Sequence, residues 1–101
     1  MTLDEFRSSL HHTEPPPLAP LLKALWLDAR GQWDAAHRLA QDVETPDGSW
    51  VHAYLHRREG DAGNAHYWYR RAGRPDFTES LSAEWDLLVQ HLLKVSSGVN
   101  A

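Results

Sequence analysis

Apolar side chains recur every three or four residues along most of the chain, which is the spacing of one face of an α-helix. The pattern predicts helices over about 3–11, 20–30, 32–43, 50–59, 62–72 and 78–95. Thr2 and Glu5 have the spacing of a capping box at the start of the first helix. No segment shows the strict two-residue alternation of a half-buried strand. The sequence therefore predicts an all-α fold.

The predicted turns contain residues that break helices. Three prolines, at positions 15–17, end the first helix because proline has no backbone N–H to donate. Glycine ends two others, at Gly31 and Gly60, since a helix C-terminus often takes a left-handed backbone conformation. Segment 44–48 has the composition of a turn, and Ser49 is then the expected cap of the next helix.

The two central hairpins form an internal repeat. Sliding Gly31 onto Gly60, an offset of 29 residues, places Ala36 on Ala65 and His37 on His66. Small residues at the alanine positions allow two helices to approach closely. A helical hairpin cannot bury its apolar face alone, so we expect each hairpin to stack on the other.

At these residues the chain resembles the tetratricopeptide superfamily, and especially its Sel-like members. Gly60-Asp61, followed by Ala65-x-x-Trp68-Tyr69-x-x-Ala72, resembles the second helix of a Sel-like repeat. The resemblance covers residues 18–72. It implies antiparallel helical hairpins stacked as a short right-handed array.

The resemblance also implies how one domain is organised. Residues 1–14 hold an N-terminal helix, 18–73 the two hairpins and 76–96 a C-terminal capping helix. Two repeats are fewer than the roughly three that a free-standing array needs. We therefore expect the flanking helices to cap the array, or a second copy of the chain to complete it. The whole chain also resembles a group of small, uncharacterised bacterial proteins with a W-V-H-A-Y-L-H-R segment, which implies no activity.

Composition excludes several classes of function. The chain has no cysteine, which rules out disulfides, thiolate zinc sites and a cysteine nucleophile. A net charge of −4 makes nucleic acid an improbable partner, because such binding depends on neutralising phosphates. No apolar run approaches the ~18 residues of a membrane span. The polar, acidic N-terminus is unlike a signal peptide, so we expect a cytoplasmic protein.

Two histidines are the sharpest candidates for chemistry. His52 and His56 are four residues apart and therefore share a helix face, opposite the expected buried face. With Glu59 as a third ligand, they have the donor set for one transition-metal ion. The other interpretation is a solvated polar face, or an intersubunit hydrogen bond. His37 and His66 are expected at equivalent edges of the second helix in each hairpin.

A basic and aromatic cluster is the second candidate site. Arginine pairs with carboxylate or phosphate through planar, forked donors. The cluster would suit an acidic peptide, a C-terminal carboxylate or RNA; the other interpretation is a solubilising surface with arginines stacked on Trp68 or Tyr69. Its members are Arg57, Arg58, Tyr67, Arg70, Arg71 and Arg74.

No catalytic constellation is present in the sequence, which lacks a G-x-S-x-G elbow and a glycine-rich phosphate loop. The first hypothesis is a non-catalytic interaction module that binds a protein or peptide and forms a homodimer, without a cofactor. The second is a metal-binding protein or small metal-dependent enzyme built on His52 and His56. The third is an RNA-associated accessory protein that uses the arginine cluster.

Overall fold

The computed structural model describes residues 1–98, and within that range it contains six helices and no strand. The predicted all-α class is confirmed. The helices are α1 (Leu3–Ser9), α2 (Pro20–Ala29), α3 (Trp33–Gln41), α4 (Pro46–Arg58), α5 (Ala62–Arg71) and α6 (Leu81–Gly98).

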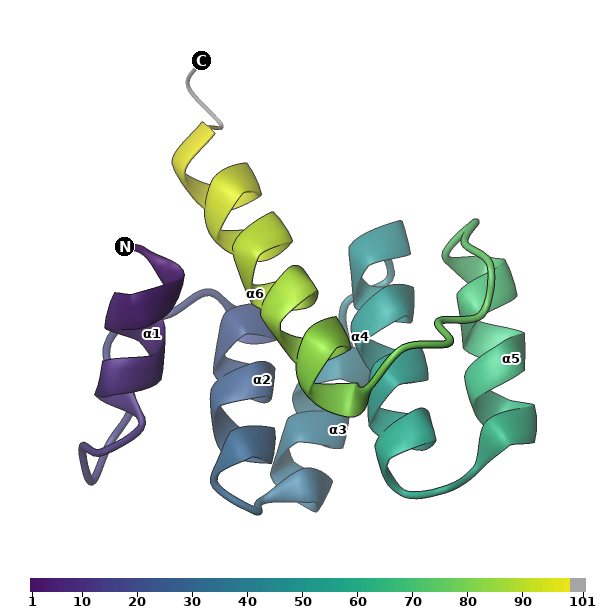
Figure 1. The fold of residues 1–101 in the computed structure, drawn as a ribbon, viewed down its shortest axis with the longest axis horizontal. Helices are drawn as coiled ribbons and strands as arrows, with labels where there is room; N and C mark the ends of the chain where they lie inside the picture. The colour runs from purple at the N-terminus through teal and green to yellow at the C-terminus, as the bar shows by residue number, and fades with distance from the viewer. Residues whose placement is uncertain (99–101) are drawn as a thin grey trace.

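Helices α2 to α5 form two antiparallel hairpins that lie side by side (Figure 1). Helix α2 packs on α3, α3 on α4 and α4 on α5, and α2 also contacts α4. Helix α6 crosses α2 and α4 and contacts α1, which stands at the edge of the fold (Figure 1). Helix α4 is therefore in contact with four other helices. These contacts set the environment of His52 and His56, the two predicted histidine ligands.

The hairpin turns repeat as the 29-residue offset predicts. Gly31 and Gly60 have φ angles of 80° and 88°, a left-handed conformation that glycine adopts without steric cost. In both turns the N–H of the following residue donates to a carbonyl five residues earlier, at 2.9 Å. This arrangement satisfies carbonyls that a helix end leaves free. Ala36 and Ala65, which occupy equivalent positions, are both buried.

A buried carboxylate ties α6 to the second hairpin. Glu84 on α6 is fully buried. It accepts hydrogen bonds from Arg57 Nη1 at 2.9 Å, from Trp50 Nε1 at 3.1 Å and from the Tyr69 hydroxyl. Burial, followed by the neighbouring Glu84, raises the pKa of Tyr69, so its hydroxyl stays a donor. The acid is thus fully hydrogen-bonded, as a buried charge must be.

The start of α4 differs from the prediction. Segment 44–48 was expected to be a turn with Ser49 as the cap, but α4 begins at Pro46 and Ser49 is buried inside it. Thr45 is the cap instead, because its hydroxyl accepts the Gly48 N–H at 3.0 Å. Proline suits the first helical position, where the missing N–H costs nothing.

Two other helix ends also differ. The last helix begins at Leu81 rather than at residue 78, since the Ser80 hydroxyl accepts the Ala83 N–H at 3.0 Å. It continues to Gly98, beyond the predicted end at residue 95. The capping box of Thr2 and Glu5 is present, but α1 ends at Ser9. In the described residues, no helix has both the length and the apolar character needed to cross a bilayer.

Candidate metal centre

The structure places three histidines together between the two hairpins. His52 and His56 lie on α4, and His37 reaches them from α3. The predicted solvated face is wrong, because His52 and His56 are only 5% and 8% exposed. The reason is that α3 and α5 both pack on α4. A face that is polar in sequence is therefore covered in the folded protein.

The three imidazole rings are close enough to share one ion. The Nε2 atoms of His37 and His52 are 2.8 Å apart. Ring centroids are separated by 4.6 Å for His37 and His52, 4.8 Å for His52 and His56, and 5.1 Å for His37 and His56. One nitrogen from each ring lies within 4.8 Å of the others. Sequence spacing had identified two of these three residues as ligands.

Two tryptophans hold the imidazoles in place. The Trp33 ring stacks on His37 at a centroid distance of 4.9 Å, and the Trp68 ring stacks on His52 at 3.9 Å. Trp33 is itself anchored, because its indole N–H donates to the Leu55 carbonyl at 2.7 Å. The cluster is therefore walled by aromatic rings.

Glu59 orients His56 from the rim of the cluster. Its Oε2 lies 2.7 Å from His56 Nδ1. A carboxylate in this position fixes the ring and its tautomer, leaving Nε2 free for a metal. His56, Glu59 and Asp61 also form a second, more exposed group of possible ligands. Asp61, however, already caps α5 by accepting the Asn64 N–H at 3.1 Å.

The surroundings of His52 and His37 favour their uncharged forms. Burial, together with the neighbouring His37 and His56, lowers the pKa of His52 to about 4. Burial and the nearby His56 also lower the pKa of His37. Both rings are therefore neutral near pH 7, and neutral imidazole is the form that binds a metal.

A cavity of about 460 Å³ opens beside the cluster. His52, Trp68, Arg71, Pro46 and Gly48 are among the residues that line it. Of the three histidines, His52 is the one that lines this cavity.

The second repeat does not form a similar cluster. His66 is equivalent to His37 in sequence, but it is exposed and its Nδ1 lies 2.9 Å from Asp76 Oδ1. His37 lies on α3, which packs against α4 of the next hairpin. His66 lies on α5, after which the chain continues as the connection to α6, without a further hairpin in the described residues. The equivalence predicted from sequence therefore holds for position and not for surroundings.

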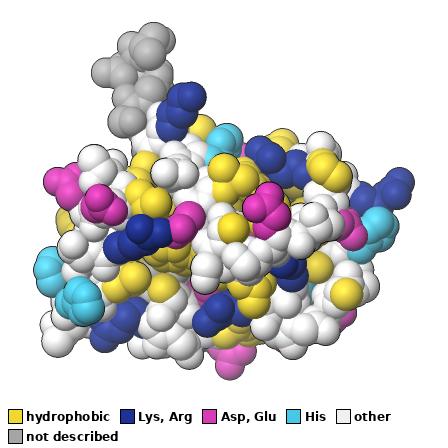
Figure 2. Space-filling view, in the orientation of Figure 1, with side chains coloured by type: hydrophobic (Ala, Val, Ile, Leu, Met, Phe, Trp, Pro, Cys, Tyr) yellow, Lys and Arg dark blue, Asp and Glu magenta, His cyan; other side chains and the backbone are white. Residues whose placement is uncertain are grey.

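The predicted arginine cluster is divided among several partners. Arg57 pairs with Glu84, and Arg58 Nε lies 3.0 Å from Asp28 Oδ1. The Arg74 guanidinium lies 3.5 Å from the centre of the Trp50 ring. Figure 2 shows basic and acidic side chains interspersed on the face it presents, without a large basic area.

Only part of that cluster remains together on α5. The Arg71 guanidinium lies 5.2 Å from the centre of the Trp68 ring, and its Nη1 donates to the Tyr67 hydroxyl at 3.1 Å. Tyr67 and Arg70 are exposed. Of the six predicted residues, Tyr67 and Arg71 are therefore in direct contact on α5.

The burial of Glu84 and Asp28 was not predicted from the sequence, although their spacing from neighbouring leucines indicates it. Glu84 lies three residues after Leu81 and four before Leu88, which places it on the inward face of α6. Asp28 follows Leu25 by three residues on α2 and is 1% exposed. A charge within an apolar stripe indicates a buried partner of opposite charge.

Comparison of the chain with protein-family models, with curated proteins and with solved structures gives no match.

Proposed function

We propose that the protein binds a divalent transition-metal ion through His37, His52 and His56, with zinc as the best fit. The observation that carries this proposal is the meeting of three imidazoles from two helices, two of them buried and the third, His37, half-buried. Two imidazole nitrogens on one tetrahedral zinc lie about 3.3 Å apart. The 2.8 Å between His37 and His52 needs only a small opening to reach that spacing.

Three protein ligands leave one position of a tetrahedral ion open. Such a position takes water or a donor atom from a ligand, as in catalytic rather than structural zinc sites. Glu59 would support the ion from outside through His56, since it already holds His56 Nδ1. The second hypothesis from the sequence thus gains His37 as a ligand, and Glu59 changes from ligand to orienting group.

Zinc is expected to raise the melting temperature of the metal-free protein. An ion that binds only the folded state stabilises it by about 2.7 kcal/mol when its free concentration is 100 times the Kd. The measurement is thermal unfolding with and without zinc, alongside elemental analysis of protein purified without a histidine tag. Stoichiometric zinc and a raised melting temperature are the expected results.

The repeat supplies a matched control for this experiment. His37→Gln is expected to remove the zinc-dependent shift, whereas His66→Gln changes the equivalent histidine outside the cluster and should retain it. Glu59→Gln is expected to weaken zinc binding by about 10–100-fold, as orienting carboxylates do. A shift that survives in His37→Gln, or is lost equally in His66→Gln, would contradict the site.

We also propose, following the first hypothesis from the sequence, that the protein is an interaction module that self-associates. A mostly apolar cavity of about 260 Å³ lies between α6 and the first hairpin; Leu21, Leu22, Val43, Leu92 and Val95 line it, together with Thr45 and Asp47 near the start of α4. Val95, on α6, is 50% exposed, and the C-terminal part of α6 extends beyond the hairpins (Figure 1). A second copy of the chain, related by twofold symmetry, would cover the same face on both molecules.

Light scattering across micromolar concentrations tests this second proposal, and a dimer is the expected mass. Val95→Asp should shift the protein to monomer, because it places a charge in the apolar contact. Leu87→Asp is the control, since Leu87 is similarly exposed on α6 but does not line the cavity. A monomeric wild-type protein would exclude self-association.

A further inference from the structure

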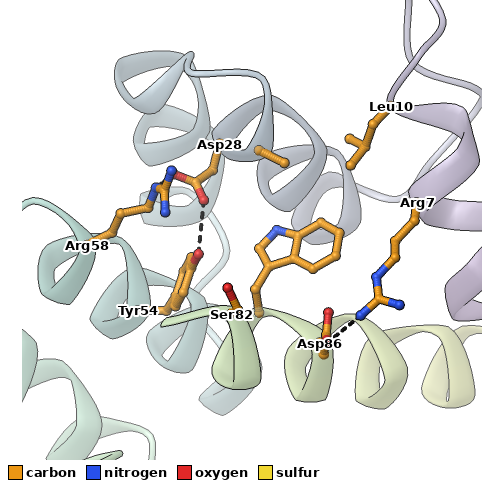
Figure 3. A pocket seen from close by; sticks show the side chains of 9 residues that line it. Arg7, Leu10, Asp28, Tyr54, Arg58, Ser82 and Asp86 are labelled. Carbon is orange, nitrogen blue, oxygen red and sulfur yellow. Dashed lines mark hydrogen bonds and ion pairs between the residues drawn. The ribbon is translucent and has the colours of Figure 1, made fainter. Parts of the chain in front are cut away.

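We propose that a second cavity, on the opposite side of α4 from the histidines, binds a small zwitterion that carries both an ammonium and a carboxylate group. A free amino acid or a dipeptide has this chemistry. The cavity has a volume of about 420 Å³ and lies among α1, α2, α4 and α6 (Figure 3). That volume is within the usual range for small-molecule sites, about 300–1,000 Å³.

A buried acid with spare hydrogen-bonding capacity lines this cavity. Asp28 is 1% exposed, and its Oδ2 accepts the Tyr54 hydroxyl at 3.2 Å (Figure 3). Its Oδ1 has no hydrogen-bond partner in the described residues, although Arg58 Nε lies 3.0 Å away. The guanidinium therefore pairs with this oxygen chiefly by charge. A ligand donor would add a well-directed hydrogen bond to this ion-paired oxygen.

The net charge around Asp28 also favours an added cationic group. Burial raises the pKa of Asp28, and Arg58 only partly opposes that effect. The carboxylate therefore lacks full compensation in the unliganded protein. A ligand ammonium beside Oδ1 would supply both a donor and a positive charge.

A second ion pair stands across the cavity. Arg7 on α1 pairs with Asp86 on α6 (Figure 3). Arg7 and Arg58 have side chains 47% and 42% exposed, so each guanidinium keeps accessible N–H donors. These donors suit a ligand carboxylate, because arginine binds that group in a planar, forked geometry.

The remaining lining fits the body of such a ligand. Trp85 and Leu10 also line the cavity and add apolar surface. The Ser82 hydroxyl, in the first turn of α6, is exposed. Two arginines and two aspartates give the lining no net charge. A molecule with one charge could interact with one of these ion pairs only, whereas a zwitterion could interact with both.

Nuclear magnetic resonance titration with glycylglycine tests this site directly. The backbone amides of Ala29 and Ser82, which line the cavity, are expected to shift and to saturate at millimolar ligand. Acetate and methylammonium each carry one of the two charges, and both should bind at least about tenfold more weakly. Absence of shifts with glycylglycine, or equal binding of acetate alone, would overturn the proposal.

Three substitutions test which side chains bind the ligand. Asp28→Asn keeps the shape and removes the charge, and it is expected to weaken glycylglycine binding about tenfold or more. Arg7→Gln changes the opposite, exposed wall, so it serves if Asp28→Asn fails to fold. Arg70→Gln removes an arginine outside the cavity and should bind as the wild type does. Unchanged affinity in Arg7→Gln would contradict the assignment.

Discussion

Glu84→Ala is expected to lower the free energy of unfolding by about 3–5 kcal/mol, the range seen when one partner of a buried ion pair is removed. The substitution leaves three donors without their acceptor, on Arg57, Trp50 and Tyr69. It also removes a polar link from α6 to α4 and α5. Since small domains are stable by about 5–15 kcal/mol, this is a large share of the total.

Chemical denaturation followed by tryptophan fluorescence measures this loss, because Trp50 is one of the residues affected. Glu79→Ala is the matched control, since it removes an exposed carboxylate from the segment just before α6. The backbone carbonyl of Glu79, which accepts a hydrogen bond from Arg57, is kept. The control should stay within about 0.5 kcal/mol of the wild type. Equal stability of the two variants would show that Glu84 has no structural role.

Gly48→Ala is expected to cost about 3 kcal/mol, at the upper end of the usual range for overpacking. A Cβ on Gly48 would collide with the Val43 carbonyl oxygen and lie 2.9 Å from the carbonyl carbon. Both atoms belong to the backbone, so no side-chain rotation relieves the clash. The bend between α3 and α4 must move, which would disturb the first turn of α4 that Thr45 caps.

Gly63→Ala tests the same chemical change without the clash. Gly63 lies in the first turn of α5, and the nearest atom to its Cβ position is Asp61 Oδ1 at 3.9 Å. Alanine there should stabilise the protein by about 0.4–1 kcal/mol, because it restricts the unfolded chain. Thermal unfolding of both variants gives the comparison. Destabilisation of similar size in both would point to a general need for glycine and not to the contact with Val43.

The positions of the helices could be predicted because they depend on residues close together in the sequence. Apolar spacing identified all six helices, and Gly31 and Gly60 marked the hairpin turns that the structure has. The errors fell at helix ends, where a single side chain decides. Thr45 rather than Ser49 caps α4, and Ser80 rather than an earlier residue precedes α6. Several hydroxyls lie near each end, and spacing alone did not show which of them accepts the free N–H.

Only part of the histidine cluster could be predicted from the sequence. The spacing of His52 and His56 placed both on one face of a helix, and that was sufficient to name them as ligands. Their burial was missed because the covering helices, α3 and α5, are supplied by other parts of the chain. His37 was noticed for its place in the repeat, yet its contact with His52 depends on how α3 packs against α4.

The sequence by itself determined the helices, the glycine turns and the equivalence of the two hairpins, because these follow from backbone chemistry and periodicity over a few residues. The tertiary structure alone decided which charged and aromatic side chains meet. It brought Glu84 to Arg57, divided the arginines among separate partners and placed His37 beside His52. The reason is physical: each such contact joins residues from different helices, and packing of the helices, rather than spacing along one of them, sets the distance.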